Sequence, residues 1–254
     1  MTSHWDFYFT RVDDQPASIY LDLGVAAQAP RAAYPELGYV RIPMLQPRED
    51  GLSSNEEFAA LGALEDHLGQ ALCADDRACF VGRNTSAGCR DFFFYVQPGA
   101  DWPLAVSRAM AQQDYDYEAG SNPDPQWQSY FGFLYPDDEA LQAMRNRGVL
   151  HALEEAGDAL VAPRPIRHWA YFPHPSDRDR YVDQARTLGF TVVTVDEGDA
   201  TTGRASCLAL MERQDVPGHG TINMVCMPLF HMARQCNGDY DGWECQVVGS
   251  EDAS

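Results

Sequence analysis

The sequence predicts an α+β fold with two domains, in which helices cover antiparallel sheets. Hydrophobic residues make up 45% of the 254 residues, so the chain can bury a core in one large domain or two ordinary-sized ones. Segments with alternating apolar residues, typical of half-buried strands, are interspersed with segments of helical periodicity. After residue 157 the order strand, helix, strand, strand, helix, strand indicates a four-stranded sheet with two helices on one face.

The expected domain boundary lies near the middle of the chain. Residues 1–136 are interpreted as an N-terminal antiparallel α/β sandwich, residues 137–156 as a helical connector and residues 157–254 as the second domain. Acidic residues at the start of the connector favour a helix there, because they complement the helix dipole. We expect Gly148 to break this helix.

The N-terminal domain begins with three expected strands, because apolar residues alternate over residues 5–9, 19–23 and 40–44. A helix follows, and a serine at position 53 or 54 with a glutamate three residues later forms a capping box at its start. Its apolar face has helical spacing and consists of Phe58, Leu61, Leu64, Leu68 and Leu72.

A hairpin is expected next, with strands over residues 79–83 and 90–96 on either side of a loop of turn-forming residues. Asp101 is expected to cap a short helix, and a strand is expected around residues 115–117. The last predicted helix of this domain covers residues 124–135, because an aspartate followed by a proline is a favourable helix start.

The C-terminal domain has a simple predicted order of elements. Strands are expected over residues 166–172, 190–195, 207–211 and 240–248, and helices over residues 176–188 and 222–236. Residues 198–203 are predicted to form a polar turn between the second and third strands.

The chain is strongly acidic, with a formal net charge of -20, and all 18 of its basic residues are arginine. Residues 1–140 hold 8 arginines against 22 acidic residues, so most of the negative charge lies in the first half. Such a surface repels phosphate backbones, and direct nucleic-acid binding is therefore disfavoured. A basic protein partner suits this charge, which also serves solubility.

The seven cysteines contain no Cys-x-x-Cys pair, which favours reduced structural thiols over disulfides or a zinc site. We expect no metal and no cofactor, since no histidine has a carboxylate or cysteine at metal-ligand spacing. No basic segment followed by an apolar run opens the sequence, and no apolar run approaches membrane-spanning length. A cytoplasmic protein without membrane attachment is therefore expected.

Three segments of the C-terminal half carry a resemblance to a known family. They are Ile-Arg-His-Trp-Ala-Tyr-Phe at residues 166–172, Leu-Gly-Phe-Thr-Val at residues 188–192 and Asp-Tyr-Asp-Gly-Trp at residues 239–243. With them, residues 157–248 resemble the bacterial regulators of ribonuclease E activity B, protein inhibitors of that endonuclease. The resemblance implies a ferredoxin-like βαββαβ sandwich, in agreement with the order of elements, and a ribonuclease as the protein partner.

The N-terminal half resembles an uncharacterised bacterial domain that occurs beside such C-terminal domains. The resemblance rests on Trp-Asp-Phe-Tyr at residues 5–8, Gly-Arg-Asn-Thr at residues 82–85 and Asp-Pro-Gln-Trp at residues 124–127. It implies no known activity. Members of the inhibitor family end in a long acidic tail, whereas this chain has only Glu251 and Asp252 as acids after Val248.

The candidate partner-binding residues lie in the matching segments or, for Arg164, just before one, and the sequence contains no specific catalytic set. They are Arg164, His168, Trp169, Asp239, Tyr240, Asp241 and Trp243. Trp243 is either a core residue or an interface anchor, since aromatic residues of this kind dominate many interfaces. Asp239 and Asp241 are explained by turn formation, with an acid–base pair as the alternative. His168 is either satisfied by neighbours within the sheet or sensitive to pH.

Three hypotheses for function remain open at this stage. The first is a non-enzymatic acidic regulator that binds a protein, by resemblance an inhibitor of ribonuclease E in RNA turnover. The second is an immunity-type protein that neutralises a basic toxin nuclease, because acidic inhibitors suit such targets. The third is an enzyme of unknown type with a pocket between the domains, for which no catalytic motif gives support.

Overall fold

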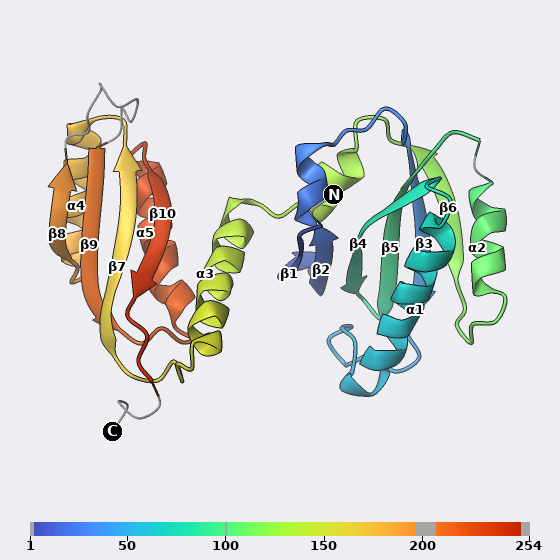
Figure 1. Ribbon diagram of the computed structural model, residues 1–254, viewed down its shortest axis with the longest axis horizontal. Coiled ribbons are helices and arrows are strands. Elements are labelled where there is room, and N and C mark those ends of the chain that lie inside the picture. The colour runs from blue at the N-terminus through green and yellow to red at the C-terminus, as the bar shows by residue number, and fades with distance from the viewer. Residues whose placement is uncertain (1–2, 100, 197–206, 250–254) are drawn as a thin grey trace. The chain divides into compact units, whose positions relative to one another are not determined.

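The computed structural model describes residues 3–99, 101–196 and 207–249, and it has the predicted α+β fold with two antiparallel sheets. The chain divides into two compact units, Met1–Asp137 and Asp138–Ser254. Figure 1 shows one sheet in each unit. The polar turn predicted over residues 198–203 lies outside the described residues.

The first unit is built on a six-stranded antiparallel sheet in the order β1-β2-β4-β5-β3-β6. Its strands are β1 (Trp5–Val12), β2 (Gln15–Asp22), β3 (Glu36–Pro43), β4 (Ala78–Ser86), β5 (Cys89–Val96) and β6 (Glu118–Pro123). A short 3-10 helix, η1 (Leu23–Ala27), follows β2. The predicted hairpin is present, but its strands are longer than expected, because the chain reverses within Ala87 and Gly88, both of which have positive φ.

Helices α1 (Asn55–Cys73) and α2 (Trp102–Met110) pack on the core residues of this sheet. Ser54 caps α1 by accepting from the backbone N–H of Glu57 at 3.3 Å. The prediction for the apolar face of α1 is wrong at one position, because the Phe58 side chain is exposed. Glu57 is buried beside it, and its carboxylate accepts the backbone N–H groups of Leu45 and Gln46 at 2.8 and 2.7 Å.

The helix predicted over residues 124–135 is replaced by a turn and a single π-helical turn, η2 (Tyr130–Leu134). Trp127 has a positive φ of 54°, which interrupts a regular helix, and its ring stacks on Tyr95 at 3.7 Å. The Asp124 carboxylate accepts the backbone N–H groups of Gln128 and Ser129. Asp124 thus holds two amides next to the helical turn, but it is not the N-cap of a helix, because Ser129 occupies the N-cap of η2 and residues 125–127 are not helical.

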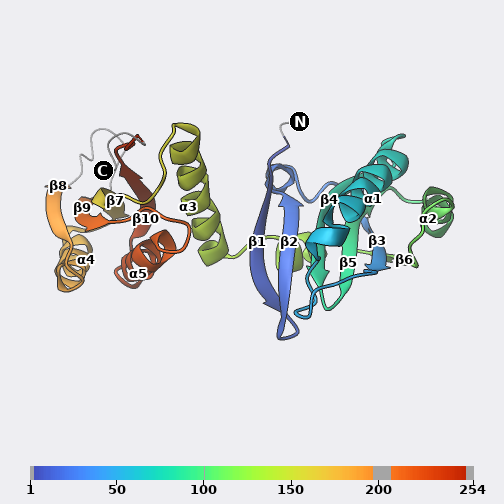
Figure 2. The same ribbon diagram turned by 90° about the horizontal axis from the view of Figure 1, so that it is seen from below.

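The second unit contains the predicted βαββαβ order, preceded by helix α3 (Asp138–Glu155). Its elements are β7 (Arg164–Phe172), α4 (Pro175–Thr187), β8 (Thr191–Asp196), β9 (Cys207–Asp215), α5 (Ile222–Gln235) and β10 (Asp239–Cys245). The sheet order is β10-β7-β9-β8 with antiparallel neighbours throughout. This is the ferredoxin-like arrangement, and Figure 2 shows α4 and α5 on one face of the sheet.

The core of this unit lies between the sheet and its two helices, where Ile166, Ala170 and Phe172 of β7 are fully buried. Helix α3 packs on α5 and β10. The predicted break at Gly148 is wrong, because α3 continues through that residue to Glu155. Packing of the helix against two neighbours offsets the cost of one glycine, which is about 1 kcal/mol.

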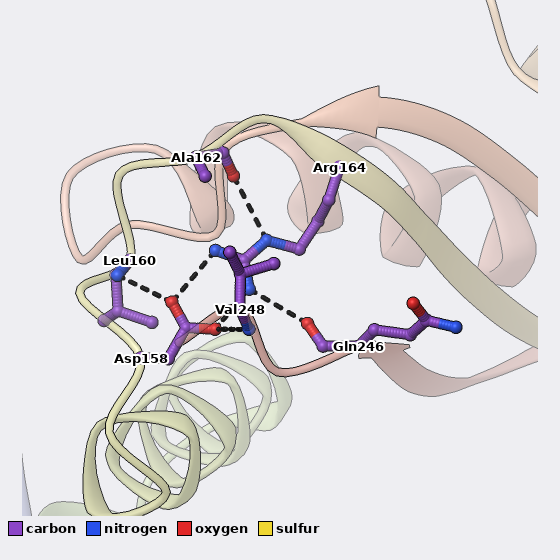
Figure 3. Close-up of polar contacts among 6 residues, drawn as sticks. All are labelled: Asp158, Leu160, Ala162, Arg164, Gln246 and Val248. Atoms are coloured by element: carbon purple, nitrogen blue, oxygen red, sulfur yellow. Dashed lines mark hydrogen bonds and ion pairs between the residues drawn. The ribbon is translucent and has the colours of Figure 1, made fainter. Parts of the chain in front are cut away.

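A buried ion pair at the start of β7 is hydrogen-bonded to the segment that follows β10 (Figure 3). The guanidinium of Arg164 forms two hydrogen bonds with the carboxylate of Asp158, and both side chains are at most 5% exposed. Asp158 also accepts the backbone N–H groups of Leu160 and Val248, each at 2.8 Å. These contacts, with the hydrogen bond from Arg164 first, hold the pKa of Asp158 well below its ordinary value.

Substitution of Arg164 by Ala should strongly destabilise the second unit. It leaves the buried Asp158 carboxylate without its counter-ion, which costs about 3–5 kcal/mol. Arg186→Ala is the matched control, because Arg186 forms an exposed ion pair with Asp183 and should contribute less than about 1 kcal/mol. Denaturant unfolding of both variants measures the difference, and equal losses would refute this interpretation.

Candidate functional site

The Tyr-Asp-Gly-Trp segment forms a β-bulge in the edge strand β10. Tyr240 pairs with Ala170 and Gly242 pairs with Trp169, so Asp241 is an extra residue without a partner in the register. Gly242 has a φ of 141°, a conformation that favours glycine. The bulge therefore explains the glycine at position 242, and it leaves Asp241 outside the strand pairing.

Tyr240 points into the core and contacts a buried histidine. Its hydroxyl lies 2.8 Å from Nδ1 of His168, and neither side chain is more than 1% exposed. The other ring nitrogen of His168 has no hydrogen-bond partner among the described residues. Burial, with a smaller contribution from the Arg213 cation, lowers the pKa of His168 to about 3. The imidazole is thus neutral at physiological pH.

Trp243 anchors β10 to helix α3 through a polar network. Its indole N–H donates to Oδ1 of Asn146 at 3.0 Å. The same oxygen accepts a hydrogen bond from Nε2 of Gln142 at 3.0 Å, and Nδ2 of Asn146 donates to Asn223 of α5 at 2.8 Å. Gln142 and Asn146 are each 1% exposed. Two amide side chains thus occupy core positions on α3.

The opposite face of the sheet carries side chains that point away from α4 and α5. Trp169 and Tyr171 of β7 lie directly across from Leu210 and Leu208 of β9, and all four are half-buried. Trp169 faces Gly242 on its other side. Because glycine has no side chain, it cannot cover the indole ring from that strand.

A groove of about 350 Å³ lies between α3 and this edge of the sheet. Among the residues that line it are Gln142, Arg145, Trp169, Tyr171, Asp241 and Glu244. Within the described part of the chain, neither Asp241 nor Glu244 forms an ion pair. We refer to this feature as the α3–β10 groove.

The structure separates the seven candidate partner-binding residues into two sets. Trp169 and Asp241 line the α3–β10 groove, as does the otherwise buried Trp243, and Asp239 is exposed on the same strand as Asp241. The buried set consists of Arg164, His168, Tyr240 and Trp243. Their side chains are held by hydrogen bonds within the second unit and can support a binding surface, whereas contact with a partner by any of the seven remains a prediction.

Sequence reasoning did not find Gln142 and Asn146. Their spacing in the sequence could have identified them as core positions, because they share a helix face with Leu150 and Leu153 at intervals of three and four residues. Polar amides at such core positions must find hydrogen-bond partners. The partner of Asn146 is the indole of Trp243, which lies 97 residues further along the chain.

Comparison with known protein families gives two matches that together span most of the chain. Residues 3–135 match a family of unknown function, DUF695, and residues 143–245 match the family of the regulator of ribonuclease activity B, RraB. The chain belongs to the DUF695 family and carries an RraB domain. Both resemblances predicted from the sequence are thereby confirmed. A comparison with curated proteins found no match.

The RraB match begins within α3 and ends at the last residue of β10. It therefore includes Asn146 and Trp243, and the α3 side chains of the groove other than Gln142. Among the described residues, no cluster of three or more metal-ligating side chains could hold an ion. In the same part of the chain, no helix combines the length and the apolar character needed to cross a bilayer.

The stability of the RraB domain should fall in mild acid because of His168. The unfolded histidine binds a proton near its ordinary pKa of 6.5, whereas the folded one resists protonation down to about 3. Stability is therefore complete above pH 6.5 and decreases as the pH falls, by about 2 kcal/mol at pH 5. Urea unfolding between pH 7 and pH 5 measures this slope.

His168→Gln should flatten that slope, even if the variant is less stable at pH 7. His174→Gln provides the matched control, because the side chain of His174 is exposed and its removal should leave the slope unchanged. An identical pH dependence of stability in His168→Gln and in the wild-type protein would contradict the assignment of this slope to His168.

Trp243→Phe should destabilise the RraB domain by about 1–3 kcal/mol. Phenylalanine cannot donate to Asn146, and it leaves part of the space of the buried indole empty. Trp169→Phe is the control for the same chemical change on the half-buried outer face. Thermal unfolding of the two variants should show the larger loss for Trp243→Phe, and the reverse order would count against the network.

Proposed function

We propose that this protein is a non-enzymatic cytoplasmic regulator that binds a ribonuclease of the ribonuclease E type and lowers its activity. The observation that carries the proposal is the RraB match over residues 143–245. The matched region has the ferredoxin-like fold expected for this family, and it contains the strand with the Tyr-Asp-Gly-Trp segment. In this proposal the DUF695 domain has an accessory role.

The charge of the chain supports a basic partner surface. A net charge of -20 accelerates the encounter with an arginine- and lysine-rich region of a nuclease and disfavours binding to RNA itself. Most of this charge lies in residues 1–140, so the DUF695 domain contributes to attraction even without a specific contact. Inhibition would follow from steric hindrance of the nuclease or its scaffold by the docked regulator.

Binding of the full chain to ribonuclease E from the same bacterium tests the proposal. Complex formation should be measured calorimetrically at about 50 and 200 mM salt, with cleavage of a model RNA followed in parallel. We expect binding and inhibition at low salt, and an affinity several-fold weaker at the higher salt because surface charges are screened. An affinity that does not change with salt concentration would contradict the electrostatic contribution to binding.

Absence of binding at both salt concentrations would refute the proposed partner. In that case the acidic charge would favour the immunity-type alternative, in which the target is a basic toxin nuclease. Capture of that nuclease, with loss of its activity, would then be the observation to seek.

A further inference from the structure

We propose that the α3–β10 groove binds an arginine side chain within a basic segment of the partner protein. The inference deepens the proposed function, because it rests on that function for the identity of the partner and adds the chemistry of recognition. Three features of the groove support it: an acceptor without a donor, a half-buried aromatic ring, and two carboxylates that form no ion pair in the described part of the chain.

The acceptor is Oε1 of Gln142. Trp243 can only donate through its indole nitrogen, so the atom of Asn146 that it contacts must be oxygen. That oxygen also receives the amide of Gln142, which must therefore present its nitrogen and leave Oε1 on the other side. Oε1 is buried and has no hydrogen-bond partner in the described part of the chain.

A buried carbonyl oxygen without a donor is unfavourable, because it has lost its hydrogen bonds to water without gaining a partner. Gln142 lines the α3–β10 groove, and the cost is removed when the groove side chains rearrange so that a ligand N–H reaches Oε1. The network thus selects a hydrogen-bond donor and discriminates against an anion, which has only acceptors to offer.

The aromatic ring is that of Trp169. The strand opposite contributes Gly242, whose missing side chain leaves the indole uncovered from that side, and Tyr171 lines the groove beside it. Tryptophan is the best partner for a cation over its ring face, and arginine occupies such positions more often than lysine. The planar guanidinium can stack on the indole while its N–H groups remain free to donate at the edges.

The charges of the groove favour a cation. Asp241 is the extra residue of the bulge, and Glu244 lies three residues later on the same strand. Arg145 is exposed at the same groove, and Arg167 lies directly across from Glu244 in the strand register. Asp241 is therefore the carboxylate best placed for a ligand cation. A ligand guanidinium has five donors, enough to satisfy Gln142 and a carboxylate together, whereas an ammonium group has three in a compact arrangement.

Titration of the full chain with three blocked peptides tests the inference. The peptides are pentaglycine analogues that carry two arginines, two lysines or two glutamines, and calorimetry at low salt gives their affinities. We expect the arginine peptide to bind measurably and several-fold more tightly than the lysine peptide, with the glutamine peptide not detected. Equal binding of the arginine and lysine peptides would overturn the stacking assignment.

Two variants test whether the arginine peptide binds at the α3–β10 groove. Asp241→Asn should weaken the arginine peptide roughly tenfold, or about 1.4 kcal/mol, since it removes the charge from a charge-assisted hydrogen bond. Trp169→Leu should weaken it by a similar factor. Asp183→Asn removes the same charge from an exposed position on α4 and should leave the affinity unchanged. Thermal unfolding verifies that all three variants are folded.

The same variants, tested against ribonuclease E, separate this inference from the proposed function. Peptide binding at the groove without ribonuclease binding would support the groove as an arginine site and refute ribonuclease E as the partner. Ribonuclease binding that Asp241→Asn leaves intact, together with no binding of the arginine peptide, would support the partner and overturn the groove. Loss of both interactions in Asp241→Asn, but not in Asp183→Asn, would support both.

Discussion

The β-bulge in β10 is the constraint on which the geometry of the RraB domain depends. Because Asp241 is inserted without a partner, the residues on either side of it return to the pairing register with β7. Tyr240 then reaches His168 in the core and Trp243 reaches α3, while Asp241 is left exposed. One irregularity in the backbone thus determines which side chains of the Tyr-Asp-Gly-Trp segment are structural and which can contact another molecule.

The contact of Trp243 with Asn146 makes α3 part of the RraB domain. The family match begins at residue 143, inside this helix, which agrees with the network that joins α3 to β10 and α5. The groove exists only because the helix is held there. Its lining combines polar groups that the network orients with aromatic groups that the sheet presents.

The order of elements in the RraB domain could be predicted because its strands and helices have clear periodicity and its turns contain glycine. The sequence was less informative where tertiary contacts overrule local preference. Gly148 continues a helix because α3 packs on two elements, and Trp127 interrupts one because its ring stacks on Tyr95. The groove itself could not be foreseen, since Gln142 and Trp169 meet only after a bulge and a helix packing that no local pattern encodes.

The ion pair of Asp158 and Arg164 brings the two ends of the βαββαβ sandwich together, since Asp158 also holds the amide of Val248. The sandwich is thus closed on itself, and the polypeptide enters and leaves it at one point. Domains of this kind tolerate being joined to other sequences, because an addition at the shared point disturbs no strand.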